Sequence, residues 1–557
     1  MTSTASPGDG QRVVVVTGGG GGIGAAIAEE LGGQGAFVVT MDPLVSLDGR
    51  EAMPAVEETT AARIVAAGGS ARTSAVSVTD RDAVHDLFES LGRLDAVVNV
   101  AGITRPTSFA RGSEEDWREV LEVHLDGYLN VLAAALPIMD AAGHGRLLGV
   151  TSGSGWRRAD AGAYSCAKRA VASLTWQLGH QAPPGVVVNA ISPIAVTRMV
   201  TAALGRTAPT GGGGRPSSAT GGLSLASLPD PEALGPFGAH LVSDEVDWCD
   251  GQVLFAGGSE VAVIEPPRLL EVVRADDMAS LAHVLEVLVP GALAPAEAQQ
   301  GTAGGSNPRF GSLFGEADAT GLAPGPAASC AVIADDPALA AAVTAALEAR
   351  AVTCTTLAAA DVAVGFGGAA DALAATIARV GPLDAVVVAL GGAVSAAGSG
   401  STWAQVLAEH DGIVDRIHVD AGWARAVADH SVAADRPLRL VTLTDATTAG
   451  GRSRAQASAQ LARASRGATG ERVAAFALSV EAPLVDAARP TSELVAHLVC
   501  HPEAVALAGA ELVAGAGWIG LRSHPRPGTS FTFGGPALPA WFDGTLRSVV
   551  GDRPAPR

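Results

Sequence analysis

An internal repeat constrains this chain more than any other feature, because a repeated segment indicates a repeated structural unit. The segment GRLDAVVNVAG at 92–102 recurs as GPLDAVVVALGG at 381–392, and VHLDGYLNV from 123 recurs as IHVDAGWAR from 417. GVVVNAISPIA from 185 is echoed by RVAAFALSVEA from 472, and GQVLFAGGSEV from 251 by GAELVAGAGWI from 509. With 557 residues, the chain has room for two α/β domains of ordinary size. We therefore predict one ancestral unit that has been duplicated.

Each unit alternates short β-branched runs with segments of helix length. In the first unit the runs are 12–17, 36–42, 94–101, 145–152, 185–192 and 251–256. This alternation is typical of the α/β class with a doubly wound, Rossmann-type parallel sheet, so we expect two such domains in tandem. A stretch rich in Pro, Gly and Ala separates the units and predicts a linker. The expected domains are 10–289 and 328–540, joined by a linker at 290–327.

The first candidate site is the glycine-rich segment TGGGGGIG, from Thr17 to Gly24. It follows a β-run and opens a helix, the placement in which backbone N–H groups bind a pyrophosphate. A flexible loop would also be rich in glycine, but Asp42 ends the next strand, 18 residues after Gly24. An acidic side chain there accepts hydrogen bonds from the adenosine ribose and repels a 2′-phosphate, although Asp42 could also be a loop cap. No arginine adjoins Asp42 in the sequence, so we predict NAD rather than NADP.

The second candidate site combines Ser152, Tyr164 and Lys168. Tyr164 and Lys168 are four residues apart in a predicted helix and therefore share one face, and Ser152 ends the strand before them. A phenol is a poor base at neutral pH, and a nearby ammonium that lowers its pKa by about 3 units supplies roughly 4 kcal/mol. Such a set exchanges a proton at an alcohol or carbonyl oxygen. The alternative is an ordinary surface pair of Tyr and Lys.

Together these motifs resemble the short-chain dehydrogenase/reductase family. The glycine motif of that family matches Thr17, Gly18, Gly22 and Gly24, with Ile23 between the last two, and its catalytic set falls on Ser152, Tyr164 and Lys168. Its Asn-Asn-Ala-Gly motif appears as NVAG, which implies cofactor contacts from Asn99, Ala101 and Gly102. NAISPIAVT, after the next strand, implies that Pro193, Ile194 and Thr197 hold the nicotinamide, with Ile194 where the family has glycine. The resemblance also implies that Tyr164 and Lys168 contact the cofactor.

Two positions depart from the family pattern. Val76 and Ser77 replace the acidic group near the adenine, which the resemblance implies weakens that contact while keeping the backbone contacts. His124 stands where most members have the asparagine of a proton relay, and either a direct catalytic role or a structural bond to a water or carbonyl is open. A narrower resemblance, carried by GITRPTSFARGSEEDWREVLEVHLDGYLNV at 102–131, is to the (3R)-hydroxyacyl-CoA dehydrogenase unit of multifunctional enzyme type 2, also called 17β-hydroxysteroid dehydrogenase type 4. That unit has histidine at this position.

The second unit lacks the residues that would carry chemistry. Asp335 and Asp336 replace the glycines of the turn, where carboxylates would repel a pyrophosphate, although Asp336 can cap a helix and Pro337 suits its first turn. Val388 replaces the asparagine, and 442–465 contains neither tyrosine nor lysine. We therefore expect a degenerate, inactive copy. Because units of the resembled family pair through two long helices each, the resemblance implies an intramolecular pseudo-dimer. Binding of another ligand by the second unit is the alternative.

Charge and hydropathy narrow the classes of partner. A formal net charge of −20, a pI near 5.0 and the lack of any basic run argue against nucleic acid and anionic membranes. The sequence shows neither a leader pattern at its N-terminus nor an apolar run of about 18 residues, so we expect a cytoplasmic protein. Cysteines without C-x-x-C spacing predict no metal site.

We therefore predict an NAD-dependent enzyme that interconverts a secondary alcohol and a ketone. The narrower resemblance implies a 3-hydroxyacyl-CoA-like thioester as substrate. A polyketide, steroid or other secondary-metabolite ketone is the alternative, because the substrate loop near 200–240 is of low complexity and Arg157 and Arg158 suit either a thioester carrier or solvent. Pairing of two chains into a homodimer is left open.

Overall fold

The computed structural model describes most of the chain. The described residues are 6–53, 58–156, 162–199, 201, 229–274, 284–293, 324–392, 401–535 and 537–551. Most of the predicted linker, most of the loop near 200–240, and Arg157 and Arg158 lie outside these ranges. Among the described residues, no helix is both long and apolar enough to cross a membrane.

The first sheet has nine strands in the order β17-β8-β7-β6-β5-β4-β1-β2-β3. Seven of them run parallel: β1 (Val13–Thr17), β2 (Phe37–Met41), β3 (Ser70–Ser74), β4 (Ala96–Asn99), β5 (Gly145–Val150), β6 (Val186–Pro193) and β7 (Val253–Gly257). β8 (Glu260–Glu265) and β17 (Arg526–Thr532) extend the sheet in antiparallel pairing. The strand order reverses beside β1, which is the switch point of a doubly wound sheet. This confirms the predicted fold class.

The second sheet follows the same order with one parallel strand fewer, β11-β10-β12-β13-β14-β15-β16-β9. The parallel strands are β10 (Ser329–Ala334), β11 (Thr353–Ala358), β12 (Ala385–Ala389), β13 (Leu438–Asp445), β14 (Val473–Val480) and β15 (Glu511–Gly515). β16 (Trp518–Arg522) and β9 (Leu269–Arg274) pair antiparallel at its edge. The repeated segments at 92–102 and 381–392 contain β4 and β12, which hold the same place in the two orders.

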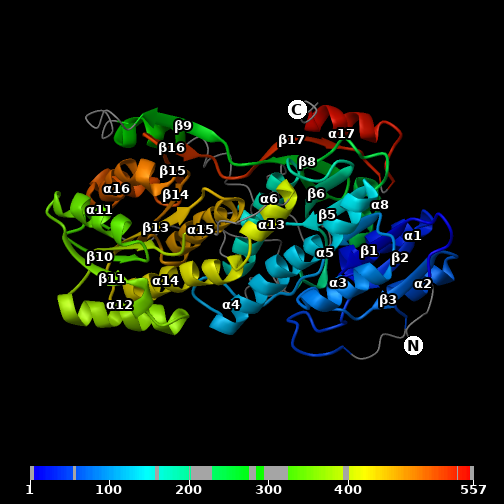
Figure 1. Ribbon diagram of the computed structural model, residues 1–557, viewed down its shortest axis with the longest axis horizontal. Helices are drawn as coiled ribbons and strands as arrows, with labels where there is room; N and C mark the ends of the chain where they lie inside the picture. The colour runs from blue at the N-terminus through cyan, green and yellow to red at the C-terminus, as the bar shows by residue number, and fades with distance from the viewer. Residues whose placement is uncertain are drawn as a thin grey trace, which may run out of the picture.

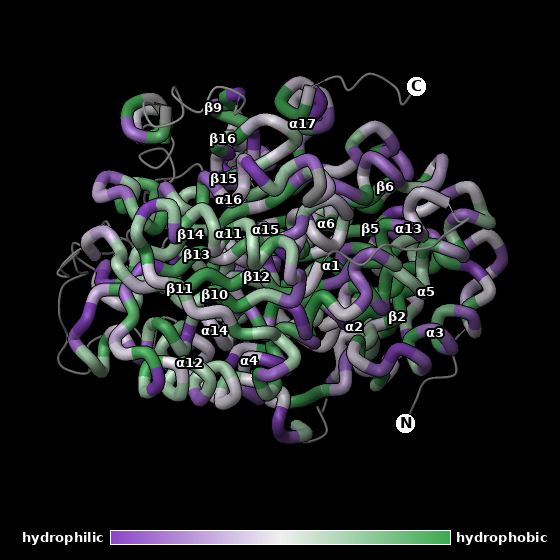
Figure 2. Tube along the Cα trace, turned by 60° about the vertical axis from the view of Figure 1, so that its left-hand side comes forward, coloured by the Kyte–Doolittle hydropathy of each residue, from purple (hydrophilic) through white to green (hydrophobic). Residues whose placement is uncertain are grey.

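Helices cover both faces of the first sheet because its strands are apolar on both sides. In β1, Val13 and Val15 enter one core while Val14 and Val16 enter the other, as alternating side chains must. The face of Val14 is covered by α1 (Gly22–Gly33), α2 (Thr60–Ala66), α8 (Gly235–Leu241) and α17 (Phe542–Val550). The face of Val13 is covered by α3 (Arg81–Ser90), α4 (Glu114–Leu121), α5 (Gly127–Ala142) and α6 (Gly162–Leu178). Figure 2 shows the apolar strands inside and the polar segments outside.

The two sheets lie side by side with helices packed between them (Figure 1). The second sheet is flanked by α11 (Pro337–Glu348), α12 (Phe366–Val380), α13 (Thr402–Glu409), α14 (Ile413–Ala433), α15 (Ala449–Ala468) and α16 (Leu484–Cys500). The most extensive helix contact between the halves is α6 against α15, and α14 also touches α4. One apolar core cluster runs through this interface and includes Ala163 and Cys166 from α6 together with Ala457 and Leu461 from α15. The halves therefore share a core.

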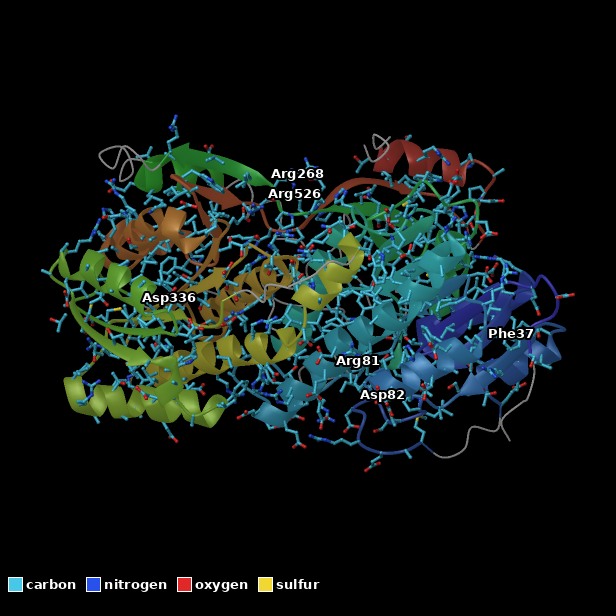
Figure 3. All side chains as sticks on the ribbon, viewed as in Figure 1. Phe37, Arg81, Asp82, Arg268, Asp336 and Arg526 are labelled. Atoms are coloured by element: carbon cyan, nitrogen blue, oxygen red, sulfur yellow. The ribbon has the colours of Figure 1, made fainter. Side chains whose placement is uncertain are left out.

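The two halves also exchange their outer strands. β9 leaves the first half to pair with β16, and β17 leaves the second half to pair with β8. Figure 3 labels Arg268 and Arg526 where the two arms meet. Glu265 forms ion pairs with both, at 3.2 Å to Arg268 and 2.9 Å to Arg526. The sequence-predicted ranges 10–289 and 328–540 therefore each contain one strand that belongs to the other sheet.

Candidate active site

The candidate site residues gather at the carboxyl edge of the first sheet, next to its switch point. Thr17, Asp42, Asn99, Ser152 and Pro193 come at the ends of β1, β2, β4, β5 and β6, and these strands are parallel. Parallel strands end at the same edge, so residues from five separate segments are brought together.

The glycine turn between β1 and α1 can be formed only without side chains. Gly18 and Gly22 have positive φ angles of 65° and 55°. A Cβ on Gly18 would lie 2.8 Å from the nitrogen of Ala101, and one on Gly24 would lie 2.3 Å from the oxygen of Gly18. Gly21, the residue before α1, is its N-cap, and no side chain among the described residues caps the helix there. The turn therefore offers a backbone cradle and a helix N-terminus to an anion, as pyrophosphate binding requires. Ile23, next in the turn, packs on the core beneath it.

Asp42 is fixed beside this turn. Its carboxylate accepts hydrogen bonds from the N–H of Gly20 at 2.9 Å and of Leu44 at 2.8 Å, and each oxygen keeps a further lone pair. This is the placement that a ribose diol needs. The sequence did not reveal a cation nearby: exposed Arg198, far away in the chain, brings Nη2 to 3.8 Å from where a Cβ of Gly21 would stand. Arg198 Nη1 also lies 3.3 Å from Met53 Sδ, so this cation stands between the first turn of α1 and the segment that follows Asp42.

Thr17 and Asn99 join the ends of β1 and β4. The Thr17 hydroxyl donates to Asn99 Oδ1 at 2.8 Å and accepts from the N–H of Ala101 at 3.1 Å, with both side chains buried. Gly102, the last residue of the NVAG motif, leaves room for the imidazole ring of His124, because a Cβ at this position would lie 2.3 Å from His124 Cε1. These residues therefore shape the floor of the site.

The segment after β6 closes the site from the side of the glycine turn. Pro193 ends β6, and the N–H of Ile194 donates to the oxygen of Ala256 at 2.9 Å. Thr197 Cγ2 lies 3.7 Å from the Cβ position of Gly22. Thr197, predicted to hold the nicotinamide, is thus a neighbour of the predicted pyrophosphate turn.

Val76 and Ser77, at the predicted adenine end, follow β3. Val76 packs against the main core, and the Ser77 hydroxyl is 2.8 Å from that of Thr79. Asn130 of α5, which sequence reasoning missed, donates to the oxygen of Val78 at 3.0 Å and so ties this segment to α5. No sequence motif signals that contact.

Lys168 lies near the Tyr164 ring and is bonded to Val150, the last residue of β5, two residues before Ser152. Ser152 begins the short 3₁₀ turn η2 (Gly153–Gly155), and its Oγ accepts from the N–H of Ser154 at 3.3 Å. Lys168 Nζ lies 5.7 Å from the centroid of the Tyr164 ring and donates to the oxygen of Val150 at 2.7 Å. Burial lowers the pKa of Lys168 to about 7, because removing the ammonium from water disfavours its charged form.

His124 lies on a π-helical turn, η1 (Glu122–Asp126), between α4 and α5. Its ring meets the Tyr164 ring edge-on, with 5.0 Å between centroids. Nε2 lies 2.8 Å from the oxygen of Ile103 and 3.3 Å from its nitrogen, so the backbone of Ile103 offers this ring nitrogen both an acceptor and a donor. Nδ1 is buried with no hydrogen-bond partner among the described residues. Burial and the nearby Lys168 hold the pKa of His124 well below its usual range, so the ring is neutral. His124 is thus bonded to the backbone of Ile103 and also packs against the Tyr164 ring.

The corresponding edge of the second sheet is filled by protein groups. Asp336, at the start of α11 (Figure 3), accepts from the N–H groups of Ala338 at 2.7 Å and Leu339 at 3.1 Å, which confirms the predicted cap. On α15, buried Arg454 is bonded to Asp420 at 2.7 Å and to the oxygens of Leu390 and Gly391. A cation already held by a carboxylate and two carbonyls therefore stands where a ligand would enter.

Comparison with known proteins agrees with the geometry of the first half. The family model "short chain dehydrogenase" matches residues 12–208. A protein of Mycobacterium tuberculosis named as a short-chain type dehydrogenase/reductase is 37% identical over 199 residues, which are 35% of this chain and 70% of that protein. An acetoacetyl-CoA reductase of Allochromatium vinosum is 31% identical over 251 residues, 44% of this chain and 97% of that enzyme.

Two further matches concern the expected subfamily and the two-domain fold. Peroxisomal multifunctional enzyme type 2 of Mus musculus is 35% identical over 196 residues, 35% of this chain but only 27% of that much longer protein. The solved N-domain of a bacterial malonyl-CoA reductase, which contains NADP, matches with a TM-score of 0.60 at 17% identity. That match covers 89% of this chain and 96% of the other, so both halves share its fold.

Proposed function

The chain belongs to the short-chain dehydrogenase/reductase family, and from that premise we propose that its first half is an NAD-dependent oxidoreductase acting on a 3-hydroxyacyl-CoA-like thioester. The observation that carries the proposal is that Lys168 lies near the Tyr164 ring and is bonded to the end of β5, which Ser152 follows, at the sheet edge that also holds the glycine turn. The proposal of a thioester substrate is supported by the similarity to an acetoacetyl-CoA reductase and to multifunctional enzyme type 2.

The residues of the glycine turn and Asp42 fit a nicotinamide dinucleotide. The cradle of Gly18, Gly22 and Gly24 has no room for side chains, and the uncapped start of α1 suits the pyrophosphate. The anchored carboxylate of Asp42 suits the two ribose hydroxyls and repels a 2′-phosphate, which favours NAD over NADP. When bound, the nicotinamide supplies the hydride-transfer chemistry.

The protein's own groups handle the proton. Because Ser152 Oγ already accepts from the N–H of Ser154, its hydroxyl hydrogen is free to bind the substrate oxygen. Tyr164 exchanges the proton with that oxygen, and the ammonium of Lys168 stabilises the phenolate. Neutral His124 packs edge-on against the phenol ring and fixes its orientation.

We also propose that the second half is a degenerate family unit that binds no NAD and serves as a structural partner. Arg454 occupies its site with bonds to Asp420 and two carbonyls, and Asp336 caps the helix that would face a pyrophosphate. The shared strand order and the helix pairing of α6 with α15 support an intramolecular pseudo-dimer. Loss of chemistry in this half therefore leaves its packing role intact.

The chain offers a matched test, since it has only two tyrosines. Tyr164→Phe should abolish reduction of acetoacetyl-CoA by NADH, followed by absorbance, while NADH binding measured by fluorescence is largely kept. Tyr128→Phe makes the same change in α5, where Tyr128 is buried and its hydroxyl lies 2.7 Å from where a Cβ of Gly149 would stand, and should retain turnover. Retained activity in Tyr164→Phe would refute the catalytic assignment. Activity on steroid or polyketide ketones but not on thioesters would refute the substrate.

A further inference from the structure

The short turn η2, which follows Ser152, is held from outside by the second half of the molecule. Gln460 Nε2 donates to the oxygen of Ser154 at 3.3 Å, and Arg463 Nη1 donates to the oxygen of Trp156 at 2.8 Å. Both donors lie on α15, and both are buried. The two carbonyls are therefore bound by a helix of the other domain.

The hydrogen bonds from α15 affect Ser152 through a single residue, Ser154. Ser154 gives its carbonyl oxygen to Gln460 and its N–H to Ser152 Oγ, so the position of its backbone sets the direction of the Ser152 hydroxyl. The N–H of Gly155 also donates to the oxygen of Ser152 at 2.9 Å. A shift of η2 would thus turn the hydroxyl that must meet the substrate oxygen.

The same helix holds the other side of the site. Arg169, the residue after Lys168, is fully buried and donates to Gln456 at 3.0 Å and to Gln460 at 3.4 Å. η2 rests directly on this part of α6, because a Cβ on Gly155 would lie 2.9 Å from the nitrogen of Arg169. Gln460 therefore bonds both to the turn that follows Ser152 and to the helix that carries Tyr164 and Lys168.

We propose that Arg463 and Gln460 of the second half are positioning residues for catalysis in the first half, holding Ser152 in register with Tyr164 through η2. The inference rests on the proposed function, in which Ser152 binds the substrate oxygen. The second domain, though catalytically inert, then contributes to turnover as well as to stability. Misplacement of a reacting group by about 1 Å can lower a rate by about 100-fold.

Arg463→Met is the main test, and Arg452→Met is its matched control. Arg452 also lies on α15 and donates to Gln177 of α6 at 2.9 Å. Within the described part of the chain, no hydrogen bond joins Arg452 to η2. With acetoacetyl-CoA and NADH as the probe, Arg463→Met should lower kcat about 10- to 100-fold with little change in the KM for NADH. Arg452→Met should leave kcat within about twofold. Arg463→Lys, which keeps a donor and the charge, should restore part of the rate and guards against a folding defect.

Hydrogen exchange gives a second readout that does not need turnover. Arg463→Met should speed exchange of the amides of Gly155 and Trp156, which are bonded within η2, more than Arg452→Met does. If the parent chain does not reduce acetoacetyl-CoA with NADH, the proposed function fails. Amide hydrogen exchange then decides alone whether Arg463 holds η2 in place. Equal exchange at these amides in the two variants, or an unchanged kcat in Arg463→Met, would overturn the inference.

Discussion

Replacing Arg169 by methionine should strongly destabilise the protein. Its guanidinium is fully buried between the two halves and pairs with Glu511 at 2.8 Å, while also touching Gln456, Gln460 and His524. Glu511 is 3% exposed, and burial raises its pKa while the charge of Arg169 acts in the opposite direction. Methionine keeps much of the volume but leaves the carboxylate without its cation.

The expected loss in the free energy of unfolding is about 3–5 kcal/mol, the usual result of removing one partner of a buried pair. The loss should be largest at high pH. Without Arg169 the pKa of Glu511 rises further, so at lower pH the carboxyl group takes up a proton and the buried charge disappears. Arg169→Met combined with Glu511→Leu should recover most of the loss, because the double variant leaves no unpaired charge at this position.

Urea unfolding followed by far-UV circular dichroism and tryptophan fluorescence measures these changes, provided that both probes report one transition. A single transition is expected because the halves share a core and exchange strands. A loss below about 1 kcal/mol in Arg169→Met would refute the reasoning. So would a double variant less stable than the single one.

Three further predictions concern protons and the cofactor. Burial lowers the pKa of Lys168 to about 7, and the ribose hydroxyls of NAD would accept hydrogen bonds from its ammonium. NAD should therefore bind with proton uptake, and its affinity should fall as the pH rises above 7. Calorimetry in buffers of different ionisation enthalpy would detect the proton uptake, and an affinity that does not change with pH would contradict the prediction. Burial and, after it, the carboxylate of Glu122 raise the pKa of Asp126 to about 7. Between about pH 4 and 7, Asp126 is therefore protonated in the folded state and ionised in the unfolded chain, so the free energy of unfolding falls as the pH rises through that window. Asp126→Asn should therefore be more stable than the parent at pH 8, by about 1–3 kcal/mol, and equal to it at pH 4, as thermal unfolding at the two values would show. Asp42→Ala should weaken NADH binding about 10-fold or more, and it should reduce the ratio of the affinity for NADH to the affinity for NADPH, both measured by fluorescence titration. An unchanged affinity ratio would count against the role of the carboxylate.

The strands and turns of the site could be predicted because local sequence determines them. The run at 12–17 became β1 at Val13–Thr17, since a β-branched segment buried on both faces has few alternatives. The glycines after it could be interpreted because close approaches at Gly18 and Gly24 exclude side chains. Asp336 caps its helix as predicted because a cap depends on residues within one turn.

Contacts between distant segments could not be predicted in the same way. Arg198 reaches the glycine turn and Arg463 reaches η2 through tertiary packing that no spacing in the sequence reveals. The filling of the second site by Arg454 was missed for the same reason, although the loss of tyrosine and lysine there was visible. The exchange of β9 and β17 was missed because an antiparallel edge strand carries no mark of which sheet it will join.

That exchange has a consequence for synthesis of the chain on the ribosome. The pair Glu265 and Arg526, where β8 meets β17, is separated by 261 residues. Strands β1 to β8 therefore leave the ribosome long before β17 exists, and the free edge of β8 is a template for pairing with other nascent chains. β9 waits in the same way for β16. The first sheet to be translated is thus the last to be completed, and pauses in translation after β9 should be the periods when this protein is most prone to aggregate.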